Sequence, residues 1–171
     1  MKSKIFIYTI TILIITIIQC TVLDYIRVYN VKPDLMIVFV IAVALLRGNV
    51  EGAAIGFVMG LLHDVISGKI LGFYSLLGLY LGLIIGSVNK RLYRENFLVI
   101  IFFTFISSIA YEGGVYFLST LTNGNADFVY AFKALILPEA VYNSIASIII
   151  YILVIKMNYR FEDVGKTTRK Y

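Results

Sequence analysis

The chain has 171 residues, of which 60% are hydrophobic by the AVILMFWYC count, a larger share than in an ordinary soluble domain. A soluble fold would leave much of this apolar surface in water, whereas about six spans of about 20 residues fill the length. The formal net charge of +5 implies no nucleic-acid partner, because the charges lie almost wholly between or outside the apolar runs. The sequence therefore predicts an all-α polytopic membrane protein with a single transmembrane domain.

The first apolar run covers residues 5–23 and follows two lysines. It is too long for the core of a signal peptide and lacks a small-x-small cleavage site, so we expect it to be a retained span. Cys20, the only cysteine, cannot form an intrachain disulfide, and the residues before it do not fit a lipid-attachment signal.

Five further runs predict spans at residues 33–46, 50–66, 70–88, 97–121 and 138–157. The second is short, so we expect it to use flanking residues as well. Proline is favoured in the first turn of a helix, so we expect the sixth span to begin at Pro138. Residues 127–137 then form an interfacial helix on the outer surface, and residues 158–171 form a basic tail.

The lysines and arginines predict the orientation of these spans. With both termini in the cytoplasm, four of the fifteen fall outside, namely Arg27, Lys32, Lys69 and Lys133. The other eleven fall inside, namely Lys2, Lys4, Arg47, Lys90, Arg91, Arg94, Lys156, Arg160, Lys166, Arg169 and Lys170. The positive-inside rule therefore favours cytoplasmic termini and an even number of spans.

Two neighbouring spans carry small residues at intervals of four: Gly52, Gly56 and Gly60, followed by Asp64, and then Gly78, Gly82 and Gly86. In a bilayer, small residues at this spacing let helix backbones approach closely. The short connection between the two spans predicts an antiparallel hairpin. The spacing does not say whether the glycines face each other or a third helix, and they could serve helix packing, partner binding or both.

Asp64 is placed near the outer end of the third span, beside His63. Two interpretations stay open for this carboxylate. It could receive a polar group of a partner where two helices are already close, or it could end the helix in the headgroup region and contact solvent. We expect a structural role for His63.

Two proline–acid pairs open spans on the outer side, Pro33 with Asp34 and Pro138 with Glu139. Each pair places a proline in the first turn and a carboxylate beside the positive end of the helix, an arrangement worth about 0.3–1 kcal/mol. This accounts for both acids without a ligand. Asn143, one turn after Glu139, should seek a hydrogen bond from another helix. All five residues are candidates for contact with a partner.

Glu112 lies within the fifth span, where an acidic side chain costs about 2–3 kcal/mol unless it is paired, protonated or hydrated. We expect it to face the interior of the bundle. A proton relay would need further acids across the inner half of the membrane, which this sequence does not supply. Catalytic sets, metal-ligand spacings and phosphate-binding loops are absent, so the sequence predicts no enzyme, no cofactor and no metal site.

Several stretches fall in a recognisable order: PDLM at 33–36, LRG at 46–48, GAAIGFVMGLLHD at 52–64 and LGFYSL at 71–76. Together they resemble the bacterial rod-shape-determining family MreD, with weaker likeness in LPE at 137–139 and YN at 142–143. The resemblance implies a non-enzymatic, multi-pass scaffold of the inner membrane. It also implies direct binding of MreC. MreB, RodA and a class B penicillin-binding transpeptidase would be further members of the complex that builds lateral-wall peptidoglycan.

On this resemblance, the single span of MreC and the start of its extracytoplasmic part are expected to dock near the outer ends of the second, third and sixth spans. The alternative is the substrate-binding S component of an energy-coupling-factor vitamin transporter, which has a similar size, six spans and an outward-facing pocket. Against it, the first span lacks the alanine-spaced surface that S components use to meet their transport partner. A proton-coupled transporter is a third class, disfavoured by the missing inner acids.

Overall fold

The computed structural model describes residues 2–27, 31–67, 72–88, 97–123 and 127–167, and the elements in these ranges are helices. Lys69, Lys90, Arg91, Arg94, Arg169 and Lys170, used above for orientation, lie outside the described residues. In chain order the elements are α1 (Lys2–Thr21), α2 (Leu35–Arg47), α3 (Asn49–Ser67), α4 (Phe73–Val88), α5 (Phe97–Asn123), α6 (Phe128–Ala131), the π-helix η2 (Phe132–Ile136) and α7 (Leu137–Thr167).

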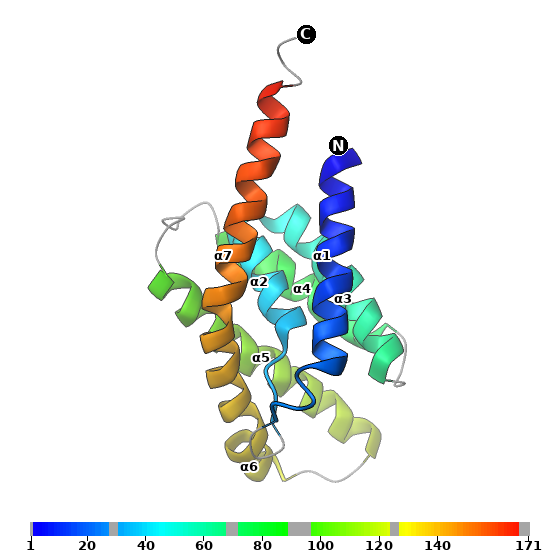
Figure 1. The fold of residues 1–171 in the computed structure, drawn as a ribbon. Helices are drawn as coiled ribbons and strands as arrows, with labels where there is room; N and C mark the ends of the chain where they lie inside the picture. Colours follow the sequence, from blue (N-terminus) through cyan, green and yellow to red (C-terminus); the bar gives the residue numbers. More distant parts are fainter. Residues whose placement is uncertain (1, 28–30, 68–71, 89–96, 124–126, 168–171) are drawn as a thin grey trace.

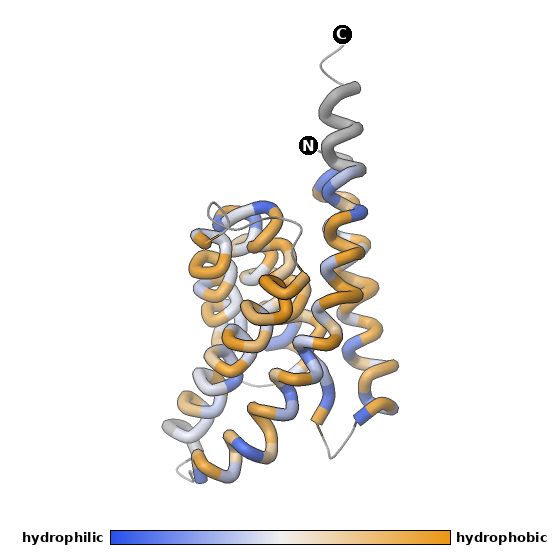
Figure 2. Tube along the Cα trace, turned by 90° about the vertical axis from the view of Figure 1, so that its left-hand side faces the viewer, coloured by the Kyte–Doolittle hydropathy of each residue, from blue (hydrophilic) through white to orange (hydrophobic). Residues whose placement is uncertain are grey.

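The all-α membrane architecture is confirmed. Four stretches are long and apolar enough to cross a bilayer: Lys4–Thr21, Asn49–Ser67, Phe97–Thr120 and Phe128–Tyr159. Apolar residues colour most of the tube in Figure 2. The start of α1 and the end of α7 lie at the same end of the molecule in Figure 1, as an even number of crossings requires. A count of six spans stays a prediction, because α2 and α4 are shorter apolar helices.

The short helix α2 is enclosed by protein, and each of its residues from Met36 to Leu46 is buried. At about 1.5 Å per residue its 13 residues extend about 20 Å, less than the hydrocarbon core of about 30 Å. The expectation that it uses flanking residues is wrong, because both ends are fixed. Asp34 caps its start, and Gly48, with φ of 94°, turns the chain directly into α3.

The glycines of α3 and α4 face each other along the hairpin, and Gly52 also lies against Ala44 of a third helix, α2. A methyl group on Gly56 would collide with the carbonyl of Gly78, and one on Gly82 would collide with the carbonyl of Gly52. Gly60 lies against the backbone of Tyr74 in the same way. The two backbones are therefore in direct contact along the hairpin. Such an approach maximises van der Waals contact where lipid offers no hydrophobic driving force.

The last helix does not begin at Pro138, contrary to the prediction. Helical structure runs without a break from Phe128 through η2 to Thr167. In η2 the bonding widens, so that the Leu137 N–H donates to the Phe132 carbonyl five residues back. This wider turn accommodates a proline, which has no N–H of its own and would clash with a normal preceding turn. Residues 158–167 of the predicted basic tail continue α7, and the position of the tail in the cytoplasm stays a prediction.

A polar network joins four helices at the end where both termini lie. Glu51 of α3 accepts hydrogen bonds from Lys4, Tyr8 and Arg47. Arg47 also donates to Asn158 of α7, with Nη1 2.6 Å from Oδ1. The network therefore fixes α1 and α7 to the end of α2 and the start of α3.

The glycine contacts give a first prediction. Gly56→Ala should lower the thermal stability of the detergent-solubilised protein, since overpacking costs about 1–3 kcal/mol and here the obstacle is backbone. Gly113→Ala is the matched control in α5, because no heavy atom lies within 4 Å of the added methyl group. Alanine is also favoured over glycine in a helix by about 0.5–1 kcal/mol. Equal losses of melting temperature in the two variants would contradict the contact.

Candidate functional site

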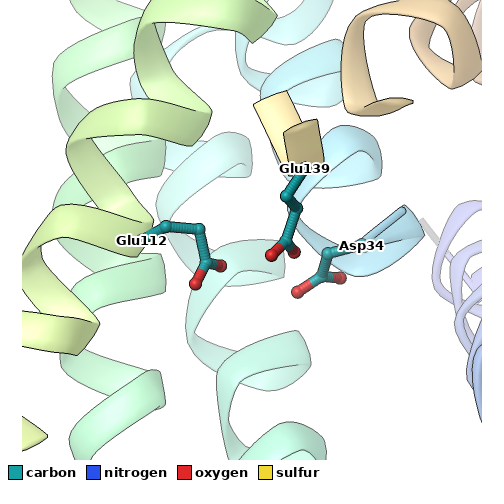
Figure 3. A group of neighbouring side chains, drawn as sticks. All are labelled: Asp34, Glu112 and Glu139. Atoms are coloured by element: carbon teal, nitrogen blue, oxygen red, sulfur yellow. The ribbon is translucent and has the colours of Figure 1, made fainter. Parts of the chain in front are cut away.

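The predicted outer-side residues Asp34, Glu112 and Glu139 meet in one cluster, although they come from three separate helices (Figure 3). One carboxylate oxygen of each lies within 4.8 Å of the others. Asp34 is buried, and the two glutamates are partly exposed. The three side chains line a cavity of about 460 Å³, which Gln19 and Asp24 near the C-terminal end of α1 also border.

Asp34 is fixed in the cluster by its role as the N-cap of α2. Its Oδ1 accepts hydrogen bonds from the backbone N–H groups of Met36 and Ile37, at 2.8 and 3.2 Å. Its Oδ2 lies 3.7 Å from Nδ1 of His63. The sequence prediction of a carboxylate at the positive end of this helix describes Asp34 well. It does not describe Glu139, because helical structure already begins at Phe128, eleven residues before this glutamate.

Asn143 holds this region together from α7. Its Oδ1 accepts from the Asp34 N–H at 2.7 Å, and its Nδ2 donates to Oγ of Ser108 at 3.1 Å. It is fully buried, so an unpaired amide here would be costly. Asn143 thus makes two of the hydrogen bonds that we expected it to make to other helices, one at the start of α2 and one on α5, and both are within this chain.

Gln19 of α1 is a site residue that the sequence analysis missed. Its Oε1 accepts from the Leu35 N–H at 3.0 Å, and its Nε2 donates to the Pro33 carbonyl at 3.3 Å. A lone amide in the apolar run of residues 5–23 is the same signal that identified Asn143 and could have been used here. Gln19 joins the C-terminal end of α1 to the start of α2.

The aromatic wall of the cavity includes His63 and Tyr74. Their rings stack with centroids 4.1 Å apart and an angle of 6° between the planes. His63 therefore contacts both the ring of the α4 residue and the carboxylate of Asp34. It is oriented by its neighbours, as expected for a structural role, and also borders the cavity.

Asp64 neither waits for a polar group of a partner nor contacts solvent at a helix end, the two interpretations that the sequence left open. The side chain is fully buried and accepts hydrogen bonds from the backbone N–H groups of Gly72, Tyr74 and Ser75, at 2.9, 2.9 and 3.2 Å. The Ser75 hydroxyl donates a fourth. The carboxylate therefore caps the start of α4 from the end of α3. It neither contacts solvent nor keeps a position open for another protein.

The electrostatics of the cluster follow from its spacing. Three carboxylates with oxygens this close repel one another strongly in a medium of low dielectric constant, so the charge must be reduced by protons or offset by a cationic group. Their oxygens also match the ligand type of a hard cation. Asp34, however, already uses one oxygen for α2. Lys32 and Arg27 line the same cavity, and both donate to Asp24, at 2.6 and 2.7 Å.

The chain was compared with known families once this geometry was in view. The family model of the rod shape-determining protein MreD matches residues 1–160. The chain belongs to the MreD family. Membership gives this MreD chain a role in determining rod shape and agrees with its apolar helices. No curated protein and no solved structure was found to match the chain, so similarity to the S-component fold stays a prediction.

Asp24 supplies a test at the rim of the cavity, outside the spans. Hydrogen bonds from Lys32 and Arg27 lower the pKa of Asp24 from 3.8 to about 2. Because the lowered pKa favours the ionised form, both ion pairs should persist at pH 4 and be lost as the pH falls through about 2. Carboxyl chemical shifts of labelled aspartate would follow this titration. Lys32→Gln should move the midpoint upward towards 3.8, and an unchanged midpoint would contradict the pairing.

The bridge made by Asn143 supplies a second test. Asn143→Leu leaves the buried Asp34 N–H and Ser108 hydroxyl without their partner, at a cost of about 1–3 kcal/mol for each buried group left unsatisfied. We expect a clear loss of thermal stability in detergent. Ile145→Leu is the control, because Ile145 on α7 is 61% exposed, and this variant should change the thermal stability little. A neutral Asn143→Leu would show that the bridge contributes nothing.

Proposed function

We propose that this protein is a non-enzymatic scaffold of the cell-elongation complex in the bacterial inner membrane. In this role it binds MreC directly and, with MreB, RodA and a class B penicillin-binding transpeptidase, supports peptidoglycan synthesis along the lateral wall. The match to the MreD family supports the role in shape determination. It also favours a scaffold over the vitamin-transporter alternative, although an outer cavity of about 460 Å³ would suit a small ligand as well.

The observation that carries the docking proposal is the acidic cavity at the outer side. Three carboxylates gather there from α2, α5 and α7, so the cavity concentrates acidic groups. Lysine or arginine at the start of the extracytoplasmic part of MreC would be attracted to these groups and oriented by charge complementarity. The expected docking region is thereby narrowed to the cavity mouth, since α2 is enclosed by protein and offers no outer surface of its own.

Asp64 and the glycines are not part of the proposed contact. Asp64 already accepts four hydrogen bonds, and the glycine faces of α3 and α4 are covered by each other. Substitutions there would break the hairpin and lower MreC binding indirectly. Glu112 and Glu139 are better probes, because glutamine keeps the shape of each side chain and removes its charge.

The test is recovery of MreC with the tagged protein after mild detergent extraction. The double variant Glu112→Gln and Glu139→Gln should recover several-fold less MreC than the unchanged protein, while its thermal stability stays the same or rises as repulsion is relieved. Asp127→Asn is the control. It removes one negative charge outside the cavity and keeps a good helix cap at α6. Full recovery of MreC by the double variant would exclude the cavity as the docking point.

A further inference from the structure

A second hollow lies on the side of the molecule between α1 and α7, which run beside each other in front of α2 (Figure 1). It is an apolar groove of about 1240 Å³. Its walls include Ile7, Ile14 and Ile18 of α1 and Ile149, Leu153 and Lys156 of α7. Both helices are long enough to cross the bilayer, so the groove opens towards lipid and not towards water. It exceeds the volume of about 300–1,000 Å³ that is usual for a small-molecule pocket.

The lining favours a flexible occupant over another helix. Transmembrane helices pack through small residues that let the backbones approach. Here the walls are mostly branched, bulky side chains, and Ala146 is the one small apolar residue among the described residues of the lining. The small-residue faces of α3 and α4 are already used within the hairpin. Acyl chains, which adapt to an irregular apolar surface, fit such walls better than a rigid helix does.

The charge at one end of the groove identifies the kind of lipid. Lys156 lines the groove towards the C-terminal end of α7, and Tyr159 lies about one turn further along the same helix. Among the described side chains Lys156 forms no ion pair, in contrast to Lys4, which pairs with Glu51. The distribution of lysines and arginines predicts that this end faces the cytoplasm, where the leaflet carries anionic lipids.

We propose that the groove between α1 and α7 binds an anionic phospholipid of the cytoplasmic leaflet. The acyl chains lie along the isoleucines of the two helices, and the headgroup phosphate pairs with the Lys156 ammonium group. This lipid fills the space that the groove leaves between α1 and α7, beside the one printed side-chain contact between them, in which the Thr11 hydroxyl donates to the Met157 sulfur at 3.6 Å. The site is separate from the acidic cavity and does not depend on MreC.

Native mass spectrometry of the intact protein, released from nanodiscs, would test this. With equal amounts of phosphatidylglycerol and phosphatidylcholine in the discs, we expect one retained phosphatidylglycerol. Lys156→Gln should lower the preference for phosphatidylglycerol about five-fold, the ratio that one lysine near an anionic surface gives. Lys133→Gln is the control, because this lysine is exposed at the other end of the same helical stretch and should leave the preference unchanged.

A second pair of variants tests the groove itself. Ala146→Phe should displace either lipid by filling the groove, whereas Ile145→Phe, on the neighbouring exposed face, should not. Size-exclusion profiles would establish that each variant is folded, and if Ala146→Phe is not, the Lys156 comparison decides alone. Equal retention of the two lipids, or a preference that Lys156→Gln leaves intact, would overturn the proposal. So would cross-linking across the groove to a second copy of the chain in place of lipid.

Discussion

Both short helices, α2 and α4, begin inside the protein, and one buried aspartate caps each of them. This constraint shapes the rest of the structure. The first N–H groups of a helix need acceptors, and in hydrocarbon no water can supply them. Asp34 caps α2 and Asp64 caps α4, each using charge-assisted bonds that are stronger than neutral ones. A helix too short to span the membrane is thereby stable at membrane depth.

The two caps differ in what surrounds them, and that difference separates structure from function. Asp64 accepts its four hydrogen bonds from groups within the α3–α4 hairpin. Asp34 has one oxygen on the α2 backbone and the other directed towards His63, near two further carboxylates. The first aspartate completes a closed unit. The second belongs to a cluster of three acids that borders a cavity, so its surroundings are open to a ligand or partner in a way that those of Asp64 are not.

Much of the fold could be predicted from the sequence because its strongest signals are periodic. Gly52 to Gly86 predicted close helix packing, and the run containing Glu112 predicted an acid facing the interior. Asp64 could not be assigned from sequence, because its partners lie eight to eleven residues later, on the far side of a turn whose geometry the spacing does not encode. The prediction of a helix start at Pro138 failed for a related reason. The π-helical turn that accommodates this proline has no recognisable pattern in the sequence. Glu51 was overlooked because an acid at a helix start appears ordinary until Lys4, Tyr8 and Arg47 are seen to converge on it.

The way α1 is attached has a consequence for how the protein is assembled. Polar contacts hold this helix at its two ends, through Glu51 at one and through Gln19 at the other. Its middle borders the groove. The glycine hairpin of α3 and α4 closes on itself without α1. The close packing of these two backbones therefore does not depend on α1, which is joined to α3 through Glu51.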